Sequence, residues 1–428
     1  MHYKVFPYIL FSFITFYSIK LKAQNKTETS CEIVNPINID DLVKSSDIFI
    51  QNNLPTINAT ERKAKKVLLN NYNYLKTIFI NKKVIKMDFI EKELITLTSK
   101  IIDANPSLQG SNFNIFYALD YTANASSMGN NIFFVYPGLF EILENDEQLT
   151  FVLCHEIAHQ VLKHYQKSIE ENINLSKAEI NYQKVLNIYR DKRELELDAD
   201  SLGFEFYTNL KYSRKEAIKA LNNLKNSDSI IYSQNIDVKK QFNFKDYPFK
   251  SFWLNENEKI LNIDSYQSDF RNLDSLRTHP NIDIRVSAIK QNSTEYNNYQ
   301  TSSRHLDKIK TWQNNYYLCA IKDSNKYDLQ LFLALKKHNE NPDDEFASEI
   351  IASTLLKIYK SKKEKQFSKY IQAPNPFAKN TSFSELKRFL KNTEAREIRK
   401  IGLWFCNSVK AKSQNLIKIH ETFKRLNQ

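Results

Sequence analysis

The sequence predicts a predominantly helical α+β protein, on three observations. Only 5 glycines occur among 428 residues, which argues against architectures with many tight turns, such as sandwiches and propellers. Apolar residues recur with helical spacing along most of the chain, as over residues 87–104. Only residues 112–121 and 131–136 have the alternating or continuous apolar pattern of short strands. A small sheet within a helical protein is therefore expected.

The other elements follow from periodicity and from capping residues. Asn145 or Asp146 can cap a helix over residues 147–164. Residues 226–278 are irregular and aromatic, and the aromatics favour a packed lid or substrate wall over disorder. Further helices are predicted over residues 175–188, 193–208 and 214–224, after Arg285, and over residues 311–321, 327–338, 345–360, 383–392 and 394–428.

The first residues indicate an export signal. Lys4 precedes an apolar run over residues 5–19, and Ala23 precedes a polar stretch. An apolar run of about 15 residues suits a secretory signal peptide better than a membrane span. We therefore expect residues 1–23 to be a removable signal peptide, with an uncleaved anchor as the alternative. No later segment has the ~18 apolar residues that a span needs, so the mature chain should have no membrane span.

Behind the signal peptide we expect a polar lead-in over residues 24–60, a first domain over residues 61–290, and a basic all-helical domain over residues 300–428. Residues 301–428 carry 25 Lys and Arg against 13 Asp and Glu, which accounts for the whole net charge of +12. No nucleic-acid-binding motif accompanies this charge, so a solvated helical surface is expected and no nucleic acid. Asn341-Pro342 and the adjacent helix pair resemble tetratricopeptide packing, although the repeat signature is absent. A protein partner at these helices is left open.

The four cysteines, Cys31, Cys154, Cys319 and Cys406, are widely spaced and include no CxxC pair. They therefore support neither a zinc knuckle nor a disulfide framework. Cys154 lies within an apolar helical segment and is expected to be a buried free thiol. A bridge between Cys319 and Cys406 is left open, since an oxidising compartment would permit one.

The segment with the clearest chemistry is His155-Glu156-Ile157-Ala158-His159. Two histidines four residues apart on a helix project from the same face, so both imidazoles can bind one zinc ion at ~2.0–2.1 Å. Glu156 is rotated by one residue, which places its carboxylate beside the metal, where it can take a proton from water. The helix is apolar around the motif, as expected of a helix buried beneath a site. This context argues against an accidental motif in a basic interaction protein.

A third ligand must come from elsewhere in the chain, because zinc at a catalytic site needs three protein ligands and an open position. Glu196 and Asp200 lie four residues apart in the acidic segment 193–200, so they share a helix face. One of these carboxylates can bind zinc while the other orients a ligand histidine through its free ring N–H. Glu194 and Asp198 are expected on the exposed face of the same helix.

Together these motifs resemble metallopeptidase family M48 of the gluzincin group. The likeness rests on residues 155–159 and 196–200 and extends over about residues 112–288. It implies a zincin-type metalloprotease domain with a small edge-strand sheet. The C-terminal region, which the periodicity predicts to be all-helical, matches no family. The likeness also implies Glu196 as the third ligand, Asp200 as the residue that supports a ligand, and one Zn²⁺ per chain.

Two further segments resemble elements of this family. Residues 131–139 resemble its edge strand before the active helix, which could pair with an extended substrate. Thr278-His279-Pro280 with Arg285 resembles its His-Pro element near the site. His279 could stabilise an oxyanion, serve as a fourth ligand that keeps the enzyme latent, or act structurally before Pro280. The remaining histidines considered, His164, His305, His338 and His420, lack partners in the sequence and are expected at the surface.

The sequence thus predicts a zinc-dependent endopeptidase with Glu156 as its general base. Without membrane-spanning segments it resembles the soluble exported branch of the family, which acts in periplasmic quality control. The expected substrates are exported polypeptides that are unfolded or misassembled. The expected location is the periplasm, with secretion or an N-terminal anchor as alternatives. The alternative function is a latent or inactive metalloprotease-like chaperone or binding protein.

Overall fold

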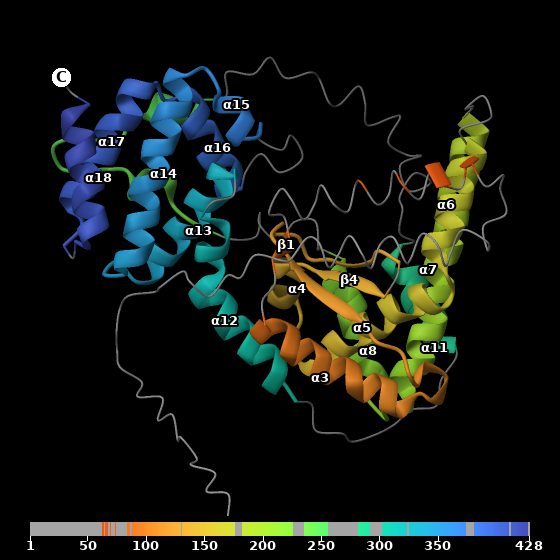
Figure 1. The fold of residues 1–428 in the computed structure, drawn as a ribbon. Coiled ribbons are helices and arrows are strands. Elements are labelled where there is room, and N and C mark those ends of the chain that lie inside the picture. The colour runs from red at the N-terminus through yellow and green to blue at the C-terminus, as the bar shows by residue number, and fades with distance from the viewer. Residues whose placement is uncertain are drawn as a thin grey trace, which may run out of the picture.

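The computed structural model describes the chain from residue 88 to residue 426, together with residues 84–85 and a few positions before them. Gaps fall at residues 130, 176–181, 226–234, 256–280, 292–301, 323–324, 374–380 and 411. The predicted signal peptide (1–23), the polar lead-in (24–60) and His279 lie outside the described residues. Figure 1 shows the described elements, with a small sheet among the helices of the first half of the chain and a helical unit at its C-terminal end.

The sheet has four strands in the order β1-β2-β4-β3. The central pair, β2 (Asn114–Ala118) and β4 (Ile132–Val135), is parallel. The outer strands, β1 (Val84–Ile85) and β3 (Ala125–Ser127), each pair antiparallel with their neighbour. Both strands predicted from the sequence are thus confirmed as the central pair. The outer strands have only two and three residues, too few for a readable pattern.

The expectation that residues 131–139 provide the edge strand is wrong, because β4 is hydrogen-bonded on both sides. All four of its residues are buried, as is typical of a strand covered on both faces. Strand β3 is one of the two outer strands, and among the described residues no strand pairs with its far side. Met128 N donates to Ile132 O (2.8 Å) and Tyr136 N to Asn124 O (3.1 Å), so the even-numbered residues bond to β4. The backbone N–H and C=O groups of Ala125 and Ser127 therefore point towards the open edge.

The central helix of this half is α5 (Asp146–Val161), whose residues are buried from Asp146 to Ala158. Asn145 caps it by accepting a hydrogen bond from Gln148 N at 2.9 Å. Its most extensive partner is α7 (Tyr182–Asn209), and it also contacts α3 (Asp88–Ala104), α8 (Arg214–Leu224) and β3. A helix surrounded in this way has no solvated face over most of its length. This agrees with the apolar residues around the histidine motif.

Two helix boundaries differ from the sequence prediction. Helix α5 ends at Val161 rather than residue 164, because Lys163 adopts a left-handed conformation with φ of 55°, and α6 (His164–Leu175) starts directly afterwards. The two helices predicted over residues 175–188 and 193–208 are one helix, α7, of 28 residues. Residues 189–192 contain no glycine or proline that would break it.

Helix α12 (Arg304–Ile321) packs against the first half of the chain, on α3, α4 (Pro137–Ile142) and α5. Tyr317 donates a hydrogen bond to Leu119 O at 2.8 Å. At its start, Asp146 of α5 accepts hydrogen bonds from His305 N (3.1 Å) and Leu306 N (2.7 Å). The first residue of α5 thus caps a helix that begins more than a hundred residues later.

The C-terminal unit is all-helical, as predicted. It contains α13 (Tyr327–Glu340), α14 (Glu345–Lys363), α15 (Phe367–Tyr370), α16 (Ser382–Asn392), α17 (Ala395–Ser408) and α18 (Gln414–Arg425). The single helix predicted over residues 394–428 is wrong, because α17 ends at Ser408 and Ser413 caps α18 by accepting from Leu416 N.

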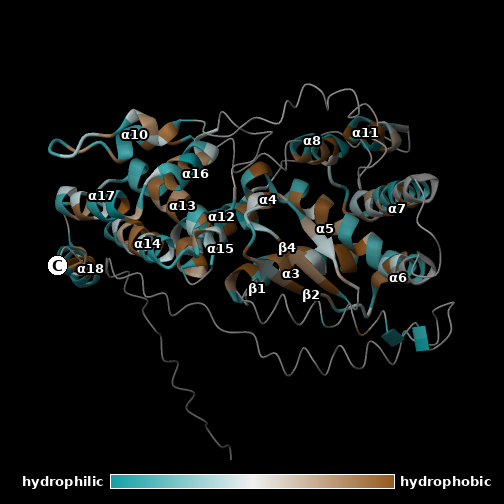
Figure 2. Ribbon diagram, turned by 90° about the horizontal axis from the view of Figure 1, so that it is seen from above, coloured by the Kyte–Doolittle hydropathy of each residue, from teal (hydrophilic) through white to brown (hydrophobic). Residues whose placement is uncertain are grey.

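The aromatic segment predicted as a lid or substrate wall packs elsewhere in its described part, residues 235–255. It contains α10 (Val238–Gln241) and the short 3-10 helix η5 (Ser251–Leu254), and both contact α16. Phe389 of α16 stacks on Phe242 (ring centroids 4.9 Å apart) and contacts Trp253 (5.8 Å). Figure 2 shows α10 beside α16 and α17, away from α5. The aromatics therefore attach this segment to the C-terminal helices.

Cys154 and Cys406 are buried free thiols, so the prediction for Cys154 is confirmed. Cys319 is disulfide-bonded. Because Cys406 is free, the bridge between Cys319 and Cys406 that the sequence left open is excluded. Among the described residues, no helix is long and apolar enough to cross a membrane.

Replacing Phe389 with alanine should destabilise the protein by about 3–5 kcal/mol, because its fully buried ring holds residues 235–255 on α16. Denaturant unfolding measures the loss, and limited proteolysis should cut the variant faster within residues 235–255. Phe252→Ala is the matched control, since Phe252 is 56% exposed and should change little. Unaltered stability of the Phe389 variant would contradict this account of the docking.

Candidate metal centre

The two motif histidines and Glu196 come together where α5 packs on α7. His155 Nε2 and His159 Nε2 lie 3.0 Å apart, as the spacing of four residues on one helix predicts. The carboxylate of Glu196 reaches across from α7, with Oε2 3.6 Å from His155 Nε2 and Oε1 3.5 Å from His159 Nε2. These three residues are the only group of metal-ligand type found among the described residues. The ligand set expected from the sequence is thus brought to one point.

A glycine permits this close packing of α5 on α7. A Cβ on Gly203 would lie 2.8 Å from the Cα of His155, closer than real Cβ atoms come to backbone. Any side chain at this position would push the two helices apart. Glu196 and Asp200 stand on α7 within two turns of Gly203. The glycine therefore fixes how far their carboxylates reach towards α5.

Asp200 and Arg285 support His155 from behind. His155 Nδ1 lies 2.9 Å from Asp200 Oδ1, and Arg285 of α11 (Ile282–Gln291) donates two hydrogen bonds of 2.6 Å to the same carboxylate. All three side chains are buried. A buried carboxylate held by a bidentate arginine stays ionised and orients the imidazole. Asp200 thus lies against His155, where the resemblance places a supporting residue, and Arg285 holds the Asp200 carboxylate.

The electrostatics of the three residues favour a cation between them. Burial opposes the charged form of His155, but hydrogen bonds to Asp200 and Glu196 outweigh it and raise its pKa to about 10. Burial and the neighbouring His155 together lower the pKa of His159 to about 3. The carboxylates of Glu196 and Asp200 thus lie against the two imidazoles and favour a positive charge there. Two imidazole nitrogens and one carboxylate oxygen also form a donor set that suits zinc.

The residues therefore fit a zinc ion, with His155, His159 and Glu196 to hold it. Glu156 lies between the two histidines on α5 and is buried. Its charge favours the charged form of Arg285. Glu194 and Asp198 are exposed on α7, as predicted.

The surface prediction for the other histidines is wrong for two of them. His164 is only 4% exposed, and its Nδ1 lies 2.8 Å from Nδ1 of His159. His420 is also buried, while His305 is half-buried beside Glu93 and His338 packs on Phe405. The sequence could have suggested the role of His164 only if the end of α5 had been recognised at Val161.

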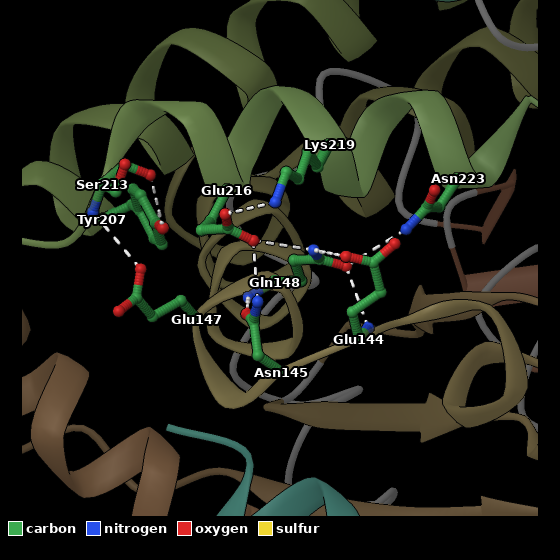
Figure 3. Close-up of polar contacts among 9 residues, drawn as sticks. All are labelled: Glu144, Asn145, Glu147, Gln148, Tyr207, Ser213, Glu216, Lys219 and Asn223. Carbon is green, nitrogen blue, oxygen red and sulfur yellow. Dashed lines mark hydrogen bonds and ion pairs between the residues drawn. The ribbon is translucent and has the colours of Figure 1, made fainter. Parts of the chain in front are cut away.

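A second group of polar residues fixes the start of α5 on α8 (Figure 3). Glu216 of α8 accepts hydrogen bonds through one oxygen from Asn145 Nδ2 (2.7 Å) and Gln148 Nε2 (2.8 Å). Its other oxygen accepts from Lys219 Nζ at 2.8 Å. Asn145 is also the cap of α5, so this network sets the position at which the helix starts. Nothing in the sequence pattern pairs residue 216 with residues 145–148.

The model of Peptidase family M48 matches residues 91–293. This part of the chain belongs to peptidase family M48. The matched M48 segment contains every described residue of the metal centre, from His155 to Arg285, together with strands β2, β4 and β3. It stops short of α12 and the C-terminal helices. The chain has no match among curated proteins.

The match supports a metallopeptidase function for this segment of the chain. The match begins at Glu91 within α3 and ends just after α11, so it spans the elements that contact α5 in the first half of the chain. It confirms the family inferred from the motifs of residues 155–159 and 196–200.

Replacing Glu216 with leucine should destabilise the M48 domain by about 1–3 kcal/mol at pH 7, because the buried amides of Asn145 and Gln148 lose their acceptor. Burial raises the pKa of Glu216, but hydrogen bonds from Lys219, Asn145 and Gln148 bring it below its usual value of 4.5. The stabilisation is therefore present above about pH 4.5 and is lost as the pH falls through the lowered pKa.

The difference in unfolding free energy between this variant and the wild type should accordingly shrink between pH 7 and pH 3. Denaturant titrations over that range measure it. Lys219→Met is the control, because its partly exposed ion pair should contribute under ~1 kcal/mol. A difference that stayed constant with pH would argue against an ionised Glu216.

Proposed function

We propose that this M48 metallopeptidase is a zinc-dependent endopeptidase that cleaves exported, unfolded or misassembled polypeptides. The observation that carries the proposal is the convergence of His155, His159 and Glu196, with Glu156 on the same helix. When bound by these ligands, zinc would polarise the scissile carbonyl and lower the pKa of the attacking water towards about 7.

The protein's own residues would transfer the proton and orient the ligands. The carboxylate of Glu156 accepts the proton of the attacking water and then delivers it to the leaving amine. Asp200, held by Arg285, keeps the Nδ1 proton on His155, so that Nε2 faces the metal. Burial of these groups strengthens each interaction by excluding water.

Strand β3 supports cleavage within a chain rather than at its end. Its open edge offers the N–H and C=O groups of Ala125 and Ser127 to an extended polypeptide. The strand contacts α5, and the Ser127 hydroxyl donates to Gln160 Oε1 at 3.5 Å, next to His159. A substrate paired with β3 would run past the ligands. Pairing through the backbone also accepts any sequence in extended form, as suits unfolded chains.

Export is supported by two features. The first 23 residues have the pattern of a signal peptide. Cys319 is disulfide-bonded, and structural disulfides persist mainly in oxidising compartments such as the periplasm. A protease in that compartment would meet proteins that failed to fold after export. The basic C-terminal helices lie outside the M48 segment and could bind a protein partner.

Glu156→Gln should lower kcat/KM for an unfolded protein substrate by about 10²–10⁴-fold while zinc content stays equal to wild type. The amide keeps the shape of the side chain but cannot accept the proton. Hydrolysis of a denatured, fluorescently labelled protein and zinc analysis by atomic absorption give both quantities. Stoichiometric zinc without hydrolysis by the wild type would instead support the latent or binding-protein alternative.

Ser127→Pro should raise KM at least several-fold with little effect on zinc content, because proline removes the outward N–H of the edge strand. Ser127→Ala is the matched control, since it removes the hydroxyl but keeps that N–H. Michaelis–Menten kinetics on the same substrate distinguish the two variants. Equal KM values for both would exclude β3 as the strand that pairs with substrate.

A further inference from the structure

The break between α5 and α6 places His164 against the metal centre. Helix α5 ends at Val161, and Lys163 then turns the chain with a positive φ of 55°. A lysine in this conformation costs free energy that glycine would avoid. The turn makes His164 the first residue of α6. Its ring meets that of His159 at 75° with centroids 4.9 Å apart.

The contact with His164 is made by Nδ1 of His159, the ring nitrogen that faces away from the other ligands. His159 Nε2 lies at the centre, near His155 Nε2 and Glu196, so a metal would take its lone pair there. His159 must then carry its proton on Nδ1, 2.8 Å from Nδ1 of His164. His164 can accept that proton's hydrogen bond only when its own proton is on Nε2. The tautomers of both rings are therefore fixed by one requirement.

The arrangement leaves a polar atom unpaired in the interior. His164 is nearly fully buried, and its Nε2 has no hydrogen-bond partner among the described residues. A buried N–H without an acceptor costs stability. A side chain that only filled space would avoid this cost if it were apolar. An apolar side chain could not, however, accept a hydrogen bond from His159 as Nδ1 of His164 can.

We infer that His164 is a positioning residue that accepts a hydrogen bond from His159 Nδ1–H and thereby holds His159 Nε2 towards the metal. This inference rests on the proposed zinc function. It gives each ligand histidine its own support: the Asp200 carboxylate for His155, and a neutral imidazole for His159. The second support adds no negative charge beside the site. Replacing His164 should weaken metal binding although all three ligand residues stay in place.

The test compares zinc affinity in full chains carrying His164→Leu or His164→Asn. Leucine fills the space without an acceptor, whereas the amide oxygen of asparagine can take the place of Nδ1. Competition with a chromophoric chelator should show zinc binding about 10–100-fold weaker for His164→Leu, and His164→Asn should restore it towards wild type. Lys167→Ala, an exposed change on the same helix, should leave the affinity unaltered.

A second readout separates positioning from stability. In metal-free protein, ¹⁵N NMR of the His159 ring should show the Nδ1–H tautomer in the wild type and in His164→Asn. The Nε2–H tautomer should become populated in His164→Leu. This readout does not depend on catalysis, and unfolding of the metal-free forms shows whether the variants are folded.

Each outcome bears on the inference. Wild-type affinity in His164→Leu would overturn it, and so would an equal loss in both variants, because shape rather than the acceptor would then matter. Zinc binding with the expected order of affinities but no peptide cleavage would uphold the inference while the proposed function failed. Absence of zinc binding by the wild type would overturn both.

Discussion

The close packing of α5 on α7 is the constraint on which the rest of the site depends. The two histidines of α5 are placed by helical spacing alone, but their third partner is on a helix that must approach to within contact of the His155 backbone. Gly203 allows that approach, and the buried pair of Asp200 and Arg285 uses it. Metal ligands, supporting carboxylate and arginine thus depend on one helix–helix distance.

Each half of the chain contributes a segment that packs on the other half. Helix α12 follows the M48 segment in sequence but packs on α3, α4 and α5. Residues 235–255 lie inside the M48 segment in sequence but pack on α16. These exchanges explain why the family match and the packing units have different boundaries.

The sequence predicted the parts of the site that depend on local spacing. His155, Glu156 and His159 follow from helical periodicity, and Glu196 and Asp200 from the same periodicity on a second helix. What failed depends on long-range or stereochemical detail. The central position of β4 follows from pairing with β3, a strand of three residues. The role of His164 follows from a left-handed lysine, which no propensity rule marks. The network around Glu216 joins residues about 70 positions apart.

The same distinction applies to the aromatic segment. Its composition indicated burial, and Trp253 and Phe242 are indeed fully buried. Composition could not identify the partner surface, which belongs to α16 and lies more than a hundred residues later in the chain. Helix ends inside long polar runs were likewise misplaced, because lysine- and asparagine-rich stretches carry few breaking residues.

The carboxylate of Asp146 links the start of α5 to the start of α12. It is the first residue of the catalytic helix and is buried, yet two of its hydrogen-bond donors are backbone amides at the start of α12. Without residues 304–321, this buried carboxylate would lack both of these backbone hydrogen-bond donors. The placement of the helix that carries His155 and His159 therefore depends on residues that follow the M48 segment in the sequence.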